Sequence, residues 1–376
     1  MSSAAIIFSN LNTNTLSRLT ADRTVAAIPF ACRYRLIDFA LSNMINANIS
    51  NINVVVNYNY RSLLDHIGSG KDWDLARRAG GINCISPYQM ASSGSAKVYS
   101  THMEALRNMT AYIDDMKEDY VVLSDCHCIA NIDLKAAIAD HAANGATITF
   151  VTTECAEGYT SKHPVLMFKA DGEGVVRDVV ISAKHQDNAP ELSTGILIMS
   201  CDYLRQLLIE AEAHNYRSLT YDVIMKNASN GCYRTFKHNG YFAHISSFTD
   251  YFRHSLDLTT NRGAFYSLLG IPERRIFTRV HNSAPVSYLS GSSVANSLIA
   301  DDCVIEGRVE NSILFRGVKI GRGTVVKNSI LFGGTTVGRD CELNCVVTDK
   351  SVTISDFCRL SGHESLPFYI GKMRRV

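Results

Sequence analysis

The sequence lacks both a net charge and a long apolar run. Its 37 basic and 36 acidic residues leave a formal net charge of +1 over 376 residues. Proteins that bind nucleic acid or anionic membranes through charge need a marked basic excess, which is missing here. A transmembrane helix needs about 20 consecutive apolar residues, and the sequence has no such run. We therefore expect neither nucleic acid nor a membrane among its partners.

The N-terminus and the cysteines lack the features of an exported protein. The N-terminus has no basic segment, and its only apolar run, Ala4–Phe8, is too short for a signal peptide. The 11 cysteines are odd in number and have no paired spacing. In a chain without an export signal, such cysteines indicate reduced thiols. These features predict a cytoplasmic protein.

The first loop of the chain lacks glycine and lysine. Ala4–Phe8 predicts a buried strand, and the polar loop Ser9–Leu16 follows it. A strand that leads into a loop at the start of an α/β domain is the usual place for nucleotide phosphates. Such a loop needs glycine, because a Cβ keeps backbone N–H groups away from the phosphate. The loop contains no glycine, and the first lysine of the chain is Lys71. The expected nucleotide site therefore lacks phosphate-binding chemistry.

Two different sequence patterns divide the chain. Its length, with 46% hydrophobic residues, exceeds that of one ordinary domain. Residues 1–255 alternate short apolar runs with helical stretches, which predicts an α/β domain with a mostly parallel sheet and helices on both faces. Residues 256–284 are the expected linker, and residues 285–376 form the second domain. The expected strands are residues 4–8, 53–57, 120–124, 147–152 and 195–199, and a helix is expected over residues 134–143 after Asp133 as N-cap.

The second domain contains an internal repeat. A motif of Asn-Ser followed by two aliphatic residues begins at Asn296, Asn311 and Asn328. Apolar residues are spaced six apart, at Leu314, Ile320, Val326 and Phe332, and again at Leu331, Val337 and Leu343. Six residues per face and three faces per coil indicate a parallel β-helix of hexapeptide repeats, in which these apolar residues point inward. Its exposed faces and ends predict an oligomer.

Several segments resemble one enzyme family. Pro29–Asn43 is similar to the motif K-P-x-x-P-F-G-G-K-Y-R-I-I-D-F-x-L-S-N of the ADP-glucose pyrophosphorylases (glucose-1-phosphate adenylyltransferases). His66–Leu75, Gly80–Ile82 and Pro87–Gln89 resemble further segments of that family. The resemblance extends from Ala4 to about residue 356. It implies a Rossmann-like nucleotidyltransferase domain followed by a left-handed β-helix.

Compared with this family, the positions that handle phosphate are altered. The glycines of its G-G-x-G-x-R-L loop align with Asn10, Leu11 and Thr13. The loop arginine aligns with Thr15, and the lysine of the K-P motif aligns with Val25. The resemblance therefore implies a phosphate loop without its cations.

The positions that hold Mg²⁺ in the family are altered as well. The aspartate of its L-S-G-D-H motif aligns with Cys126, although a one-residue gap would place Asp125 there instead. The second metal aspartate, in its D-F-G motif, aligns with Ser218. In a further segment, G-Y-W-x-D-V-G-T, the aspartate aligns with His244. Cys126–Cys128, with a histidine between two cysteines, does not predict a zinc site, because successive strand residues point to opposite faces and no second ligand pair follows. We expect no cofactor bound by this chain, with Asp125 as the metal ligand if the chain is active.

Other positions retain side chains of interest. The expected remnants of the nucleotide and sugar-phosphate pocket also include Gly81, Gln89, Lys184 and Gly195. Lys184 either replaces the lysine of the family's E-K-P motif or is a solvated surface lysine. Arg33 and Arg35 either clamp a phosphorylated effector or form ion pairs at the rim of the sheet or at a subunit contact.

The resemblance implies a GlgD-type, non-catalytic subunit. The family converts ATP and glucose 1-phosphate to ADP-glucose and pyrophosphate with Mg²⁺. Losing the loop cations and the metal ligands removes several contributions to transition-state stabilisation, each on the order of 3 kcal/mol. We therefore expect a regulatory subunit for bacterial glycogen synthesis that joins a catalytic subunit in a hetero-oligomer, as a tetramer, with a homo-oligomer also open. The alternatives are an active nucleotidyltransferase with a rearranged metal site and a module that senses nucleotide or sugar phosphate.

Overall fold

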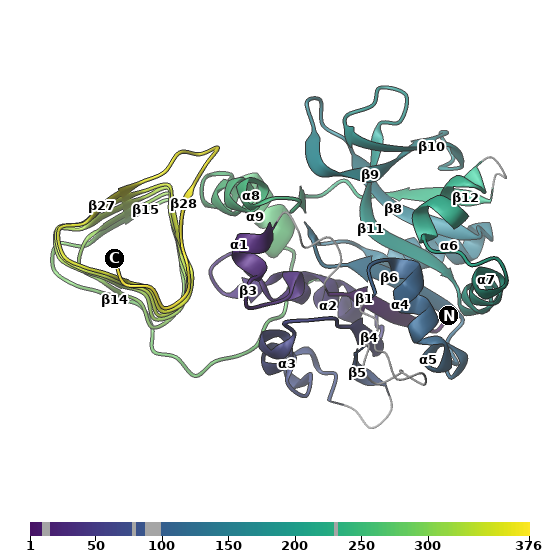
Figure 1. Ribbon diagram of the computed structural model, residues 1–376, viewed down its shortest axis with the longest axis horizontal. Coiled ribbons are helices and arrows are strands. Elements are labelled where there is room, and N and C mark those ends of the chain that lie inside the picture. The colour runs from purple at the N-terminus through teal and green to yellow at the C-terminus, as the bar shows by residue number, and fades with distance from the viewer. Residues whose placement is uncertain (10–15, 77–79, 87–98, 229–231) are drawn as a thin grey trace.

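The chain folds into an α/β domain and a three-sided β-helix that lie beside each other (Figure 1). The computed structural model describes residues 1–9, 16–76, 80–86, 99–228 and 232–376. In the part of the chain that the structure describes, no helix combines the length and the apolar character of a membrane span.

A nine-stranded mixed sheet forms the centre of the first domain. Its main strand order is β10-β9-β11-β6-β1-β4-β5, and β8 joins β12 to β11. The strands are β1 (Ser3–Phe8), β4 (Asn51–Val55), β5 (Gly81–Ile85), β6 (Tyr120–Asp125), β8 (Ile148–Glu154), β9 (Thr160–Ala170), β10 (Val176–Lys184), β11 (Glu191–Ser200) and β12 (Tyr233–Lys237). Strands β6, β1, β4 and β5 are parallel, whereas β11 runs antiparallel to β6, β8 and β9. The five expected strands and the α/β class are confirmed.

Helices cover both faces of this sheet, as the continuous apolar strands predict. Ile6 packs with the cluster that includes helices α4, α5 and α7, whereas its neighbour Ile7 packs with the cluster that includes α2, α3 and α6. These helices are α2 (Leu36–Asn46), α3 (Arg61–Ile67), α4 (His102–Asn108), α5 (Thr110–Asp114), α6 (Leu134–Asn144) and α7 (Cys201–Ala213). The Ala136 N–H donates to Asp133 Oδ1 at 3.0 Å, which confirms the expected N-cap.

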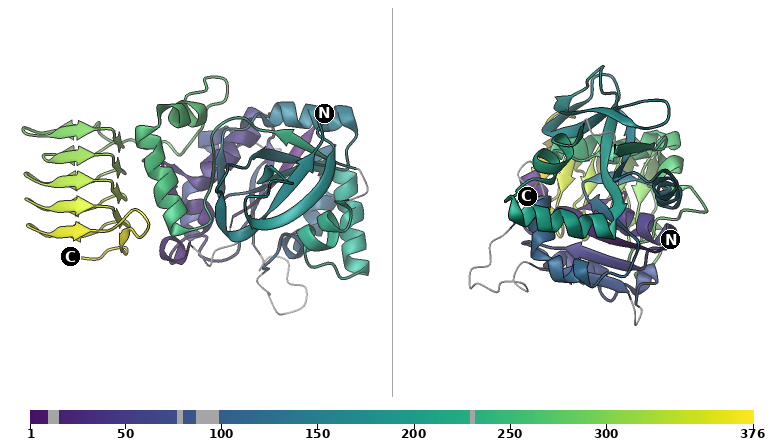
Figure 2. Two further views of the ribbon diagram at one scale, coloured as in Figure 1. Left: turned by 90° about the horizontal axis from the view of Figure 1, so that it is seen from above. Right: turned by 90° about the vertical axis from the view of Figure 1, so that its right-hand side faces the viewer.

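The remaining elements that precede the β-helix are mostly short. They are α1 (Ser17–Thr20), η2 (Val25–Ala27), β2 (Pro29–Phe30), β3 (Tyr34–Arg35), η3 (Lys71–Trp73), β7 (Cys128–Ala130), η5 (Leu219–Met225), β13 (Phe242–His244), α8 (Phe248–Thr260) and α9 (Arg262–Leu269). The expected linker, residues 256–284, thus includes the end of α8 and all of α9. Both helices have buried apolar faces, so this segment is partly helical. Helix α8 lies between the coils and the central sheet (Figure 2).

The second domain consists of three parallel five-stranded sheets, in agreement with the left-handed β-helix that the resemblance implies. Its strands are β14 (Ser287–Tyr288), β15 (Ser293–Ala295), β16 (Leu298–Ile299), β17 (Val304–Ile305), β18 (Arg308–Glu310), β19 (Ile313–Leu314), β20 (Lys319–Ile320), β21 (Val325–Lys327), β22 (Ile330–Leu331), β23 (Thr336–Val337), β24 (Glu342–Asn344), β25 (Val346–Thr348), β26 (Thr353–Ile354), β27 (Arg359–Ser361) and β28 (Phe368–Ile370). Coils stack along one direction (Figure 2).

The Asn-Ser motif forms one corner in three successive coils, and Cys345, with a φ of 52°, takes that corner in the next coil. Asn311 and Asn328 both adopt a φ of 46°, a left-handed conformation that asparagine tolerates. The buried Ser329 hydroxyl donates to Lys327 O at 2.6 Å and accepts from the Val346 N–H of the next coil at 3.1 Å. The repeat therefore supplies this corner with both a left-handed residue and a hydroxyl that satisfies buried backbone groups.

The prediction that Phe332 points into the β-helix is wrong. Leu314, Ile320 and Val326 point into the β-helix core as predicted, but Phe332 packs in the cluster between the domains. Its ring lies 6.4 Å from that of Tyr251 in α8, and Leu331 takes the inward position. The 17-residue coil is one residue short of three hexapeptides, so the six-residue step does not hold around the whole coil.

Candidate functional site

A cavity of about 270 Å³ opens at the C-terminal ends of β1 and β6. In sheets with parallel strands, ligands bind at such ends, so this is the expected place for a nucleotide. Its lining includes Phe8, His102, Asp125, His127, Cys128, Gly195, Ser218 and His244.

Asp125, the last residue of β6, is already paired within the chain. Its Oδ1 lies 2.9 Å from Nε2 of His102 at the start of α4. Burial raises the pKa of Asp125, but the charge and hydrogen bond of His102 outweigh burial and hold it below the usual value. Burial lowers the pKa of His102, but Asp125 outweighs it and the pKa is raised. The carboxylate is therefore ionised and bonded to an imidazole.

Gly195 makes room for this carboxylate. It lies at an irregularity of β11 between Ser193 and Ile196 and has a φ of 76°. A Cβ there would lie 3.3 Å from Asp125 Oδ2 and 3.2 Å from Asp125 Cβ. The structure thus brings two of the predicted residues, Asp125 and Gly195, into contact distance.

Two positions that align with catalytic groups of the family face the core instead. Cys126 is 2% exposed and belongs to the apolar cluster on the α2, α3 and α6 face. Val25 in η2 is also buried, in the cluster between the domains. Because Cys126 follows Asp125 directly, their side chains point to opposite faces, and Asp125 is the one that reaches the cavity.

Ser218 lines the cavity but caps a helix. Its Oγ accepts from the Tyr221 N–H at 3.2 Å at the start of η5, a π-helix. Asp222 Oδ2 accepts from the backbone N–H groups of Arg217 and Ser218, both at 2.9 Å. Ser218 Oγ and Asp222 Oδ2 are therefore committed to the start of this helix.

Other predicted remnants lie elsewhere. Gly81 begins β5 and pairs with Asn51, at the strand ends opposite the cavity. Lys184 ends β10, is exposed and does not line the cavity. The remaining predicted positions, Asn10, Leu11, Thr13, Thr15 and Gln89, lie outside the described residues.

Arg33 and Arg35 point to different partners. Arg33 is exposed and lies 3.9 Å from Asp301 Oδ2 of the β-helix. Arg35 donates to Ser62 O in α3 at 2.6 Å and to Ser62 Oγ at 3.1 Å. Both arginines thus have contacts within the chain, and their role toward an effector stays a prediction.

A group that sequence reasoning missed lies at the rim of the cavity. His127, Cys128 and His244 bring their ligand atoms within 4.8 Å of one another. The sequence offered His127 and Cys128 as neighbours, but the third residue comes from β13, which pairs with β7. The replacement of a family aspartate by His244 was the available signal.

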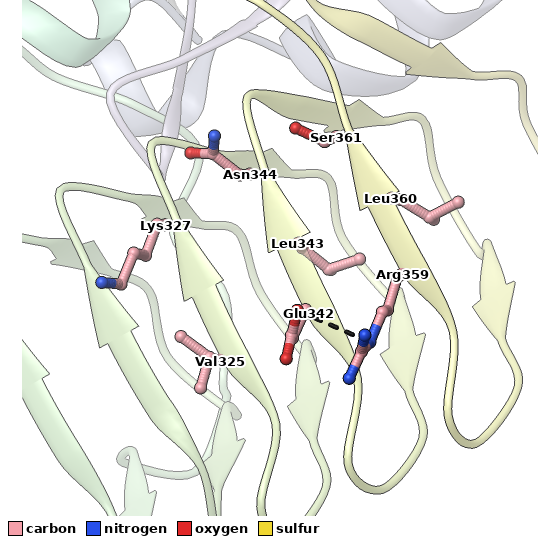
Figure 3. Close-up of a pocket in the computed structure, with 8 residues that line it drawn as sticks. All are labelled: Val325, Lys327, Glu342, Leu343, Asn344, Arg359, Leu360 and Ser361. Carbon is pink, nitrogen blue, oxygen red and sulfur yellow. Dashed lines mark ion pairs between the residues drawn. The ribbon is translucent and has the colours of Figure 1, made fainter.

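A second hollow, of about 460 Å³, lies on the β-helix (Figure 3). Its side chains come from β21, β24 and β27, and Glu342 pairs with Arg359 at 3.6 Å. It combines aliphatic residues with ion-paired surface residues and includes neither cysteine nor histidine. The cavity at the sheet edge is therefore the better candidate site.

The chain is similar to proteins of known families. Residues 5–177 match the Nucleotidyl transferase family, and residues 287–363 match the family described as GlmU-like, C-terminal hexapeptide. The "Glycogen biosynthesis protein GlgD" of Bacillus subtilis (strain 168) is 35% identical over 363 residues, which cover 96% of this chain and 92% of that relative. The protein of the same description from Geobacillus stearothermophilus is 32% identical over 83% of this chain and 79% of its own. The "Glucose-1-phosphate adenylyltransferase" of Pseudothermotoga lettingae is 33% identical over 86% of this chain and 76% of its own.

Proposed function

This chain belongs to the ADP-glucose pyrophosphorylase family, which includes glucose-1-phosphate adenylyltransferases and GlgD proteins, and we propose that within it the chain is a non-catalytic, regulatory subunit. Its partner would be a catalytic subunit that makes ADP-glucose from ATP and glucose 1-phosphate with Mg²⁺ for glycogen synthesis. The assembly would be a hetero-oligomer, with a tetramer as the expected form.

The composition of the cavity carries this proposal. Among the described residues that line it, none is lysine or arginine. The segment that aligns with the family's phosphate loop, residues 10–15, has the sequence Asn-Leu-Asn-Thr-Asn-Thr and contains no basic residue. A triphosphate needs cations and a metal to neutralise its charge in the transition state. Because Asp125 is anionic and the described lining has no such cation, the cavity disfavours binding of a triphosphate.

The carboxylates near the cavity offer little to a Mg²⁺ ion. Asp125 is bonded to His102, and the oxygen of Asp222 that accepts from Arg217 and Ser218 is committed to the start of η5. Each electrostatic group lost from an active site typically removes on the order of 3 kcal/mol of transition-state stabilisation. The absence of several such groups supports negligible turnover by this chain alone.

Contacts between the two domains support a regulatory role. Arg33 of the α/β domain faces Asp301 of the β-helix, and Arg35 lies near Lys350 of the β-helix. Burial, followed by the charges of Arg35 and Arg23, lowers the pKa of Lys350 to about 8. Cations gathered at this boundary favour an anionic effector, whose binding would change the relative stability of domain arrangements.

The test compares ADP-glucose formation by this chain, by an intact catalytic homologue and by their mixture. We expect no turnover by this chain and a mixture that differs from the homologue in maximal rate or in the concentration of effector that it requires. Arg35→Gln should reduce that difference, whereas Arg322→Gln, at an exposed arginine of the β-helix, should not. A mixture that behaves as the homologue alone would reject the proposal.

The position of Asp125 favours a second candidate, an active nucleotidyltransferase with a rearranged metal site. Its carboxylate reaches the cavity beside Gly195. This function predicts turnover by the purified chain that Asp125→Ala abolishes. A third outcome, stabilisation by ATP or glucose 1-phosphate without turnover, would indicate a sensing module.

A further inference from the structure

We propose that His127, Cys128 and His244 form a binding site for a soft divalent cation, with Zn²⁺ as the best fit. The site would lie at the rim of the cavity. This inference goes beyond the proposed regulatory function and does not depend on it.

The pairing of two strands brings the ligands together. Strand β7 (Cys128–Ala130) runs antiparallel to β13 (Phe242–His244), and Cys128 lies directly opposite His244. Residues directly opposite in an antiparallel pair have Cβ atoms about 4.5–5.5 Å apart and share one face. His127 precedes β7, and its carbonyl accepts from the Ile245 N–H at 2.8 Å. The same short ladder therefore holds all three side chains.

The ligand atoms lie slightly farther apart than they would around a bound metal ion. One ligand atom from each residue lies within 4.8 Å of the other two. Zn–N bonds of about 2.0 Å and Zn–S bonds of about 2.3 Å put tetrahedral ligand atoms roughly 3.3–3.6 Å apart. The rings of His127 and His244 are 5.0 Å apart. Backbone hydrogen bonds fix the strands, so the proposed site needs its side chains to move inward by roughly 1 Å.

The ligand types select the metal. Two imidazoles and a thiolate suit Zn²⁺, whereas Mg²⁺ prefers oxygen ligands. The hydroxyl of Tyr159 lies 2.8 Å from Nδ1 of His244, which leaves the other ring nitrogen for the metal. Such a partner orients a metal-binding histidine. The three side chains therefore include suitable ligand atoms, and Tyr159 orients one of them, His244.

The fourth coordination position would open toward the cavity. His127, Cys128 and His244 line that cavity together with Asp125. Three protein ligands with one open position leave room for water or for an anion. A bound cation would thus supply positive charge in a cavity whose described lining has no lysine or arginine.

The test is metal titration of the full chain after treatment with a chelator. Co²⁺ is the probe, because a thiolate–cobalt bond gives a charge-transfer band in the near ultraviolet, and Zn²⁺ is then added to displace it. We expect one equivalent of Co²⁺ and a thiolate band in the parent chain. Cys128→Ser should remove the band and weaken binding by more than about 100-fold, because loss of a direct ligand should cost more than the roughly 10–100-fold typical of an outer-shell partner. Cys358→Ser, at a half-buried cysteine of the β-helix, is the matched control. It should leave the thiolate band and the Co²⁺ affinity unchanged.

Tyr159→Phe provides an independent test that does not alter a ligand. It should weaken Co²⁺ binding by about 10-fold, with the thiolate band and the stoichiometry retained. The melting temperature of each metal-free variant shows whether it is folded, and if Cys128→Ser does not fold, Tyr159→Phe decides. Absence of the band in the parent chain, unchanged binding by a folded Cys128→Ser, or unchanged binding by Tyr159→Phe would each overturn the site.

Discussion

One buried ion pair should control how strongly the two domains depend on each other. Arg23, which follows α1, places its Nη2 2.5 Å from Asp349 Oδ1 of the β-helix, and the side chains are 3% and 5% exposed. The Tyr369 hydroxyl donates to Asp349 Oδ2 at 2.8 Å. The Arg23 guanidinium also lies 5.8 Å from the centre of the Phe332 ring. The perturbation is Asp349→Asn, which keeps the shape but removes the charge.

The expected loss of stability follows from burial. Removing one partner of a buried ion pair leaves the other charge without compensation, which typically costs about 3–5 kcal/mol. The hydrogen bond from Tyr369 to a charged acceptor contributes about 1.5–3 kcal/mol, so Tyr369→Phe should have a smaller effect. We expect Arg23→Met combined with Asp349→Asn to cost less than Asp349→Asn alone, because no unpaired charge remains buried.

Urea denaturation with two signals can measure this coupling. Trp73, the one tryptophan of the chain, is 1% exposed and reports on the α/β domain. Circular dichroism reports on both domains. We expect coincident transitions in the parent chain, whereas Asp349→Asn should shift the midpoint and separate the two signals. A loss below about 1 kcal/mol, the usual range of an exposed pair, would refute the claim that this pair joins the domains.

Three further predictions concern single side chains. Ser329→Ala should lower the free energy of unfolding by about 1–3 kcal/mol in urea denaturation, because the Val346 N–H and Lys327 O lose a buried partner. Gly195→Ala should cost roughly 1–2 kcal/mol from its left-handed φ alone, measured in the same way. His254 has its pKa lowered to about 4, chiefly by burial. Since the unfolded chain binds this proton below about pH 6.5, stability should fall between about pH 6.5 and 4, on the order of 2–3 kcal/mol, and His254→Phe should remove that part of the pH dependence.

The elements that the sequence predicted well are those with a local, regular cause. Strand β1 is buried on both faces, so it appears in the sequence as the continuous apolar run Ala4–Phe8. Helix α6 begins after a side chain that caps it, Asp133. The corner motif of the β-helix recurs in three coils, where the asparagine is left-handed and the serine hydroxyl accepts from a backbone N–H of the next coil. Periodicity and capping are properties of neighbouring residues, so no knowledge of distant contacts was needed.

The features that escaped prediction depend on distant contacts. Phe332 keeps the six-residue spacing in the sequence but faces α8, because the second domain must cover the first. Arg33 and Arg35 alternate along the chain, yet their partners belong to the β-helix and to α3. The cluster of His127, Cys128 and His244 depends on the pairing of β7 with β13, which no local pattern in the sequence shows.

The proposed cation site differs in its ligand atoms from the oxygen ligands that Mg²⁺ prefers. In the family resemblance, the aspartate of L-S-G-D-H aligns with Cys126, or with Asp125 after a one-residue gap, and the aspartate of G-Y-W-x-D-V-G-T aligns with His244. Cys126 packs in the core and offers no ligand to the cavity. His244 instead stays at the rim of the cavity opposite Cys128, where an imidazole joins a thiol and a second imidazole. Oxygen ligands suit Mg²⁺, whereas this nitrogen and sulfur set suits Zn²⁺. Mg²⁺ in excess should therefore not displace Co²⁺ from the proposed site.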